Sequence, residues 1–372
     1  MDYQKRFTEI VAFLAPFSDI WLKEVLYEYP DLSAYPKEWI DWLSSLSEED
    51  AWLIDCRKNN AVLGDSPMAD YWNKIKSLTE LPREEEHPDE LPSWAWTFVR
   101  GKKRHEINQI RGVLAKLHDM SSIKVVDIGG GTGQLGRVLA LYHGIPVTSI
   151  DMNAEFQELG KKRISKYPKP EGHADLSFIN TFFDETIFDR HPELQNECGE
   201  NSLIVGLHTC GPLAIEQMRA GLKTKSRSLF NFACCYNKLD ENKDVNLSNI
   251  AKEVGLNLNK YALTLATRGH ADMTLNEYQF KKRVKTFRYT LQLLCLKNGI
   301  ADRLESVGSA VPSVYRGDFE DYAMEKLSFA GISHSFTKED MRSFYQDPNI
   351  QREVEKMFFA NLIRWQMGIS SL

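Results

Sequence analysis

A glycine-rich loop near the middle of the chain is the first segment whose residues could do chemistry. It reads Asp127-Ile128-Gly129-Gly130-Gly131-Thr132-Gly133 and follows a run of apolar residues. Glycines at this spacing make a tight turn and let the backbone approach a ligand closely. The loop therefore predicts a ligand site, and the glycines alone fit more than one ligand class.

Two acidic side chains help to choose between those classes. Read from Gly131, the loop matches the dinucleotide fingerprint; read from Gly129, it resembles motif I of the class I S-adenosylmethionine methyltransferases. Asp127 favours the second interpretation because a carboxylate just before the turn would repel a pyrophosphate, whereas S-adenosylmethionine carries an ammonium and a sulfonium group. Asp151, at the end of the next apolar run, can accept hydrogen bonds from both ribose hydroxyls. We expect S-adenosylmethionine, with a nicotinamide or flavin cofactor as the alternative and a purely structural loop as the third possibility.

Two segments further along the chain carry candidate catalytic side chains. They are Leu207-His208-Thr209-Cys210-Gly211 and Ala233-Cys234-Cys235-Tyr236. His208 could act as a general base near neutral pH. Alternatively, His208 and the cysteines could bind zinc, or the cysteines could be small buried apolar residues. Adjacent cysteines lack the usual two-residue spacer of zinc sites, so we expect no metal.

The motifs follow predicted strands. Short apolar runs alternate with segments of helical spacing, which predicts strands at 123–128, 146–151, 176–180, 203–207 and 229–234. Strands alternating with helices are typical of an α/β, Rossmann-like parallel sheet. Ligands bind beyond the carboxyl ends of such strands, so the two cysteine-containing segments face each other across the site if the last two strands are neighbours.

The flanking parts of the chain are predicted to be helical. Seven of the eight tryptophans precede residue 97, and we expect most of them in a core. Ser47 and Thr337 are predicted helix caps. Residues 81–88, rich in proline and glutamate, predict a linker. We expect three consecutive parts: a helical tryptophan-rich region at 1–95, a cofactor-binding domain at 100–300 and a helical extension at 301–372.

Composition and charge limit the function classes. The 372 residues are 42% apolar and 11% aromatic, which excludes a largely disordered chain. No run of 18 uncharged apolar residues, secretory signal or transit peptide is evident, and six scattered cysteines do not make a disulfide scaffold, so we expect a cytoplasmic protein. The net charge is −6, and residues 1–95 alone carry −11. Basic runs at 102–104, 161–163 and 281–285 could contact phosphates, although such runs are more often solvated helix faces.

Four segments occur in the order found in the methyltransferase-like protein 25 family, also labelled rRNA adenine dimethylase domain-containing, and the chain resembles that family. The segments are Lys102-Lys103-Arg104-His105-Glu106, the glycine loop, Leu-His-Thr-Cys-Gly and Ala-Cys-Cys-Tyr. The tRNA ribose 2′-O-methyltransferases of the related Methyltransf_32 group look similar. The resemblance implies a class I methyltransferase fold and an RNA acceptor, with a protein side chain as the alternative acceptor.

The resemblance also implies roles for individual residues. The cofactor would be held by Asp127, Gly129, Gly131, Gly133, Asp151, Met152 and His105. The acceptor site would be lined by His208, Cys210 and Tyr236. The chain has no Asn/Asp-Pro-Pro-Tyr segment, which would indicate methylation of a base amino group. A cofactor-binding interaction protein without catalysis is the second hypothesis, and the oligomeric state stays open.

Overall fold

The chain folds into two compact units. The computed structural model describes residues 2–56, 63–64, 66–81, 89–117, 122–240, 246–267, 273–300 and 311–369. One unit is Leu81–Val245, and the other combines Met1–Glu80 with Asn246–Leu372. Each unit has its own core.

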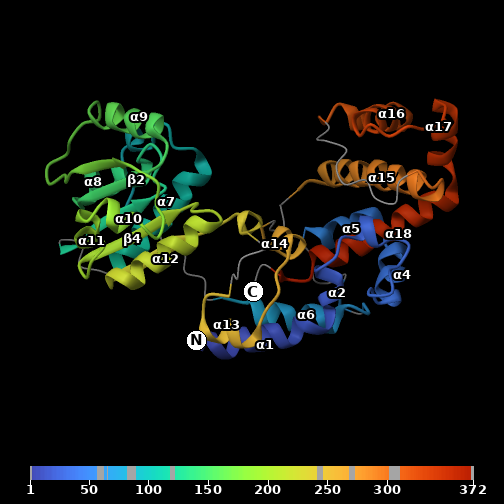
Figure 1. Cartoon of the computed structure of the whole chain (residues 1–372), viewed down its shortest axis with the longest axis horizontal. Coiled ribbons are helices and arrows are strands. Elements are labelled where there is room, and N and C mark those ends of the chain that lie inside the picture. Colours follow the sequence, from blue (N-terminus) through green and yellow to red (C-terminus); the bar gives the residue numbers. More distant parts are fainter. Residues whose placement is uncertain are drawn as a thin grey trace. The chain divides into compact units, whose positions relative to one another are not determined.

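The 81–245 unit is built on one parallel sheet with the strand order β3-β2-β1-β4-β5. Figure 1 shows helices on both faces of this sheet. The strands are β1 (Lys124–Ile128), β2 (Val147–Asp151), β3 (Leu176–Asn180), β4 (Ser202–Leu207) and β5 (Ser228–Phe232). The helices are η2 (Ser93–Trp96), α7 (Gly101–Leu117), α8 (Gln134–His143), α9 (Ala154–Ile164), α10 (Ile187–Arg190), α11 (Glu193–Glu197), α12 (Pro212–Thr224) and η4 (Tyr236–Lys238). All five predicted strands are confirmed, and so is the α/β class.

Apolar side chains on both faces of the central strands hold the sheet in place. Successive residues of a strand point to opposite faces, so Val125 packs in the cluster with Ile107 of α7, whereas Val126 packs in the cluster with Ile187 of α10. Both faces of β1 and β4 are therefore covered. Full burial of such a side chain contributes about 1.5–3 kcal/mol, which explains why these strands read as continuous apolar runs.

The fifth strand ends earlier than the sequence predicts. It was expected to reach Cys234 but stops at Phe232, which pairs with Leu207 of β4. Cys234 and Cys235 therefore lie in the loop after the strand. There the strict alternation of side chains no longer applies.

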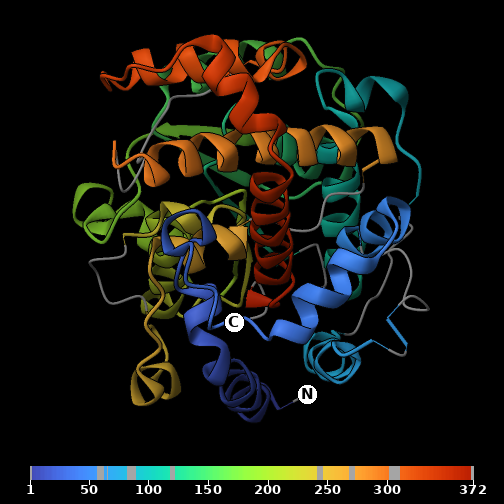
Figure 2. The same cartoon turned by 90° about the vertical axis from the view of Figure 1, so that its right-hand side faces the viewer.

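The other unit is helical and contains the two chain ends. In Figure 2, α18 (red) crosses α15 (orange). Its helices are α1 (Tyr3–Leu14), η1 (Ala15–Phe17), α2 (Ser18–Trp21), α3 (Val25–Glu28), α4 (Lys37–Ser45), α5 (Glu48–Asp55), α6 (Ala69–Thr79), α13 (Asn249–Val254), α14 (Lys260–Thr267), α15 (Leu275–Lys297), η5 (Val314–Arg316), α16 (Phe319–Phe329), α17 (Lys338–Gln346) and α18 (Pro348–Trp365). The capping roles of Ser47 and Thr337 are confirmed, because each side chain accepts a hydrogen bond from the third helical residue.

The division of the chain differs from the three consecutive parts expected from the sequence. Tyr289 and Leu293 of α15 pack in one core with Trp21, Trp39 and Trp72 from the beginning of the chain. The residues after 245 thus join the N-terminal helices instead of extending the sheet unit to 300. Helical spacing from about residue 283 onward indicates a helix within α15, but it does not reveal which core that helix packs against.

Two predicted segments lie largely outside the described residues. They are the linker at 81–88, of which 82–88 are not described, and the loop Arg268-Gly269-His270. In the part of the chain that is described, no helix combines the length and the apolar character needed to cross a lipid bilayer.

Candidate active site at the carboxyl edge of the sheet

A cavity of about 530 Å³ opens at the carboxyl ends of the strands. This volume falls within the range of small-molecule sites, about 300–1,000 Å³. Its walls come from the loops after β1 to β4 and from the start of α12. The lining residues are Gly129, Ile150, Asp151, Met152, Thr181, Phe182, Phe183, Asp184, Glu185, Cys210, Pro212, Leu213, Glu216 and Arg219.

The glycine loop adopts a backbone that side chains would not allow. Gly129, Gly131 and Gly133 have φ of +70°, +59° and +67°, in the left-handed region that favours glycine. Gly130 is excluded from carrying a side chain for another reason: an added Cβ would lie 2.3 Å from the hydroxyl oxygen of Ser149. The glycines thus shape the floor of the site, and of the four only Gly129 lines the cavity.

Asp151 joins the glycine loop to the start of α9. Its Oδ2 accepts a hydrogen bond from the Gly131 N–H at 2.9 Å, and its Oδ1 accepts one from the Asn153 N–H at 2.8 Å. A carboxylate oxygen has further lone pairs, so both oxygens can still accept from a ligand. Met152 follows it with 68% of its surface exposed and also lines the cavity. The expected places of Asp151 and Met152 at a ligand site fit this geometry.

Asp127 lies below the loop and does not line the cavity. Its side chain is 2% exposed, and its Oδ2 has no hydrogen-bond partner among the described residues. Burial raises the pKa of Asp127 from 3.8 to about 7; the charge of Lys103 opposes this rise and that of Asp151 adds to it. Its carboxylate places negative potential beneath the loop, so a cationic ligand above would favour the ionised form.

The loop after β3 supplies a wall of the cavity that the sequence analysis missed. Thr181, Phe182, Phe183 and Asp184 line the cavity. The Asp184 carboxylate is held by the Thr186 N–H at 2.9 Å and by the Arg190 guanidinium at 3.0 Å. The rule that ligands lie beyond the carboxyl ends of parallel strands could have found this loop, because it follows a predicted strand.

His208 has a strained backbone and a carboxylate partner. Its φ is +68°, which is unusual for a residue other than glycine. Its backbone N–H donates to the Phe232 carbonyl at 3.1 Å. Its Nε2 lies 3.0 Å from Oε2 of Glu106 on α7. This pair holds the imidazole in one orientation. Glu106 belongs to the Lys-Lys-x-His-Glu segment, and its contact with His208 joins residues 102 positions apart.

The two cysteine-containing loops are neighbours, which satisfies the condition for them to face each other across the site. β4 and β5 pair in parallel, and Cys210 Sγ lies 2.9 Å from Cys234 Sγ. Cys210 lines the cavity. His208 and Tyr236 are exposed and do not line it, and His105 is an exposed residue of α7. The structure therefore brings Cys210 to the predicted cofactor residues and leaves His208, Tyr236 and His105 outside the cavity wall.

A comparison with models of known protein families found one match within this unit. Residues 102–242 match the model of a methyltransferase domain family, Methyltransf_32. Together with the five-stranded parallel sheet, the match supports a methyltransferase and confirms the expected fold class, which is that of the Rossmann-like class I methyltransferases. No solved structure gave a significant match to the chain.

Proposed function

We propose that the 81–245 unit is an S-adenosylmethionine-dependent methyltransferase of the methyltransferase-like protein 25 type and that its acceptor is RNA. One observation carries the methyltransferase proposal: a single cavity is lined by Gly129 of the glycine loop, by Asp151 and by Cys210. The predicted cofactor side and the predicted acceptor side thus meet in one space.

The residues of the cavity fit S-adenosylmethionine, which supplies an electrophilic methyl group on its sulfonium. The Asp151 carboxylate would accept hydrogen bonds from the ribose hydroxyls. Asp127 would stabilise the positive charges from beneath the loop, and a buried carboxylate there disfavours a pyrophosphate. Met152 and Phe182 offer exposed apolar surface to the adenine ring. Domains of this class typically use this cofactor.

His208 is proposed to remove a proton from the acceptor. The imidazole is 37% exposed, so an acceptor can reach it from solvent. The carboxylate of Glu106 would stabilise the imidazolium that forms. Strained backbone often marks a functional position, and the φ of His208 agrees with such a role. The remaining residues contribute by holding the reactants in line.

An exposed aromatic ring beside a basic run supports RNA as the acceptor. Phe98 is 63% exposed, and the guanidinium of Arg163 lies 4.2 Å from the centre of its ring. Residues 161–169 include five lysines and arginines and no acidic residue. Exposed rings and guanidinium planes stack on bases, and cations contact phosphates. The side chain of Gln134, which follows the glycine loop, donates to the Phe98 carbonyl at 2.6 Å. Phe98 and the basic residues at 161–169 form what we call the Phe98 patch. Through Gln134 this patch adjoins the loop of the proposed cofactor site.

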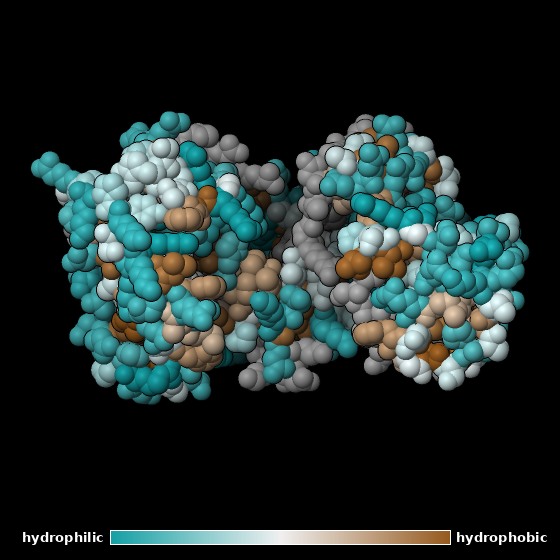
Figure 3. Space-filling model, turned by 90° about the horizontal axis from the view of Figure 1, so that it is seen from above, coloured by the Kyte–Doolittle hydropathy of each residue, from teal (hydrophilic) through white to brown (hydrophobic). Residues whose placement is uncertain are grey.

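One face of the 81–245 unit is largely hydrophilic. On the face of the 81–245 unit visible in Figure 3, polar residues (teal) predominate, and hydrophobic residues (brown) occur in small groups. A polar surface with scattered apolar side chains fits a solvated, charged partner. It fits a partner with an extensive apolar interface less well.

The cofactor is tested by calorimetric titration of the full chain with S-adenosylmethionine, S-adenosylhomocysteine and NAD. We expect the first two to bind and NAD not to bind. Asp151→Ala should abolish binding, because it removes the ribose acceptor and leaves the Gly131 N–H unpaired. Asp175→Asn, an exposed carboxylate just before β3 at the opposite edge of the sheet, should bind normally. Binding of NAD instead would overturn the proposal.

The acceptor is tested by transfer of a tritiated methyl group to fractionated cell extract. We expect label that ribonuclease removes and protease does not. The double variant Lys162→Ala/Lys166→Ala should weaken RNA binding. A plot of the logarithm of the association constant against the logarithm of the salt concentration should become less steep by about 2. Lys225→Ala/Arg227→Ala removes the same charge near the start of β5, at the opposite edge of the sheet, and should change neither. Label removed by protease would identify a protein acceptor, and cofactor binding without transfer would favour a non-catalytic binding protein.

A further inference from the structure

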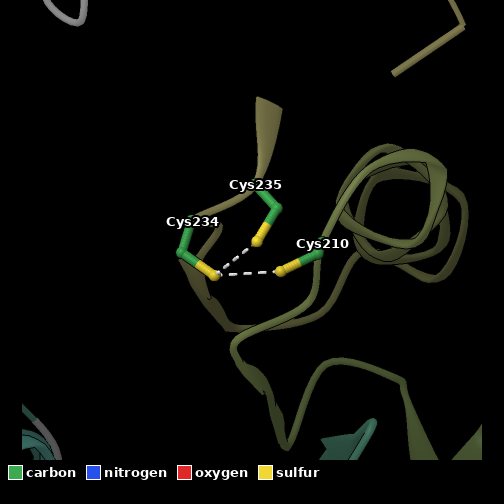
Figure 4. Close-up of side chains that lie close together, drawn as sticks. All are labelled: Cys210, Cys234 and Cys235. Atoms are coloured by element: carbon green, nitrogen blue, oxygen red, sulfur yellow. Dashed lines mark hydrogen bonds between the residues drawn. The ribbon is translucent and has the colours of Figure 1, made fainter. Parts of the chain in front are cut away.

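Three thiols gather where the loops after β4 and β5 meet. Figure 4 shows Cys210 pointing from one loop toward Cys234 and Cys235 on the other. The Sγ atoms of Cys210 and Cys234 are 2.9 Å apart, those of Cys234 and Cys235 are 3.4 Å apart, and all three lie within 4.8 Å of one another. All three residues are partly exposed.

The remaining cysteines behave differently. Cys198 and Cys295 are buried singly in apolar clusters, as small hydrophobic residues usually are. Ordinary core packing explains those two but not three thiols at the edge of a cavity. The question is what holds the three together.

The backbone on both sides of the cluster is fixed by hydrogen bonds. The Thr209 hydroxyl donates to Gln217 Oε1 at 3.1 Å, and Asn231 donates to the Ala214 carbonyl at 2.8 Å. The His208 N–H to Phe232 carbonyl bond joins the ends of the two strands. Gly211 packs so closely that an added Cβ would lie 2.9 Å from Lys238. The thiols therefore face one another on a rigid frame, which is what a metal site requires.

The objection from the sequence, that adjacent cysteines lack a spacer, does not hold in this geometry. Neighbouring residues of a strand point to opposite faces, but Cys234 and Cys235 lie after the end of β5. With φ of −120° and ψ of 70° at Cys235, both thiols reach the same side. Four ligands at about 2.3 Å from zinc place sulfur atoms about 3.8 Å apart. Shifts of less than about 1 Å would bring the three thiols to that spacing.

Binding of a metal ion to this cluster would release the thiol protons to solvent, because thiolates and not thiols are the ligands of a metal.

We propose that Cys210, Cys234 and Cys235 bind a zinc ion through three thiolates. Three protein ligands leave the fourth tetrahedral position to water or to a substrate atom, as in catalytic zinc sites. Because Cys210 lines the cavity, this position lies beside the place proposed for the acceptor. A histidine ligand is not needed, since the Nε2 of His208 is already paired with Glu106.

Metal content is measured on the full chain, purified under reducing conditions with zinc in the medium and no chelator. We expect about one zinc ion per chain by mass spectrometry. Cobalt added to the reduced, metal-free protein should produce thiolate-to-cobalt charge-transfer absorption. This second measurement needs no variant, so it stands even if a substitution impairs folding.

Single variants locate the ligands. Cys210→Ser, Cys234→Ser and Cys235→Ser should each lose the ion and the absorption, whereas Cys198→Ala, a buried thiol of the same unit, should keep both. Native protein with less than about a tenth of an ion per chain and no cobalt absorption would overturn the proposal. Zinc retained in all three serine variants would also overturn it. The same holds for a Cys210–Cys234 disulfide that persists in protein purified under reducing conditions. Calorimetric cofactor binding is a separate measurement, so failure of the zinc site and failure of the proposed methyltransferase function are distinguishable.

Discussion

Replacing Asp127 with asparagine tests how the glycine loop is supported. The carboxylate is buried beneath Gly130, and one of its oxygens has no partner among the described residues. Its pKa is raised by burial from 3.8 to about 7. Asparagine has nearly the same shape but no charge. The variant therefore isolates the free-energy cost of holding an ionised group in this position.

The raised pKa of Asp127 determines whether the protein gains or loses stability as the pH rises. A carboxyl group whose pKa is higher in the folded than in the unfolded chain makes the protein less stable as the pH rises. The free energy of unfolding begins to fall near pH 4. It falls by about 1.4 kcal/mol per pH unit, and the loss levels off above pH 7 at about 4 kcal/mol. Asp127→Asn should therefore stabilise the ligand-free unit by about 4 kcal/mol at pH 8 but by only about 1.5 kcal/mol at pH 5. The difference between the two values does not depend on how the amide itself packs.

Hydrogen exchange of the β1 amides measures this difference, because it reports the opening of the sheet unit alone. Native protein, Asp127→Asn and the control Asp175→Asn are compared at both pH values without ligand. The control should show no pH-dependent difference. An equal effect of Asp127→Asn at pH 5 and pH 8 would refute the reasoning, because it would mean that Asp127 ionises without cost in the folded chain. The variant should also bind S-adenosylmethionine more weakly at pH 8, since it lacks the charge beneath the loop.

Three further variants test the site. Gly130→Ala places a Cβ 2.3 Å from the Ser149 hydroxyl and should weaken cofactor binding at least about tenfold in calorimetry, whereas Gly101→Ala, with open space around it, should not. His208→Gly relieves a left-handed backbone, so it should leave the free energy of unfolding unchanged or raise it by about 1 kcal/mol, yet lower the methyl-transfer rate at least about 100-fold. Glu106→Gln removes the carboxylate that would stabilise the imidazolium formed during proton abstraction, so it should lower the methyl-transfer rate at least about tenfold; an unchanged rate would contradict the base role.

The central strands of the sheet, β1, β2 and β4, could be predicted because their burial is nearly complete. β1 and β4 are covered on both faces, so Val125-Val126 and Leu203-Ile204-Val205 read as unbroken apolar runs. The glycine loop was recognisable because left-handed backbone leaves a sequence signature that few other residues can supply. Asp151 followed from its place at the end of a predicted strand. These features are local, and the sequence encodes them within a few residues.

Features that depend on distant contacts could not be predicted in the same way. Glu106 and His208 are 102 residues apart, and nothing in either segment indicates their contact. The periodicity of α15 predicts a helix but not that it packs against the N-terminal tryptophans. The early end of β5 depends on the edge of the sheet, where partial exposure weakens the apolar pattern. Because β5 ends before Cys234, the side chains of Cys234 and Cys235 do not have to point to opposite faces of the sheet.

The strand order explains why the two sides of the candidate site meet. In the order β3-β2-β1-β4-β5, successive strands are added on one side of β1 up to β3 and on its other side from β4 onward, and a crevice forms at the carboxyl ends of the strands at such a switch point. The loops after β1, β2 and β3 carry the proposed cofactor residues, whereas those after β4 and β5 carry His208 and the three thiols. The two sets touch at Gly129, where an added Cβ would lie 3.7 Å from Thr209. A ligand bound by the first set would therefore lie against the second, and for this reason we propose that the methyl acceptor binds beside the thiol cluster.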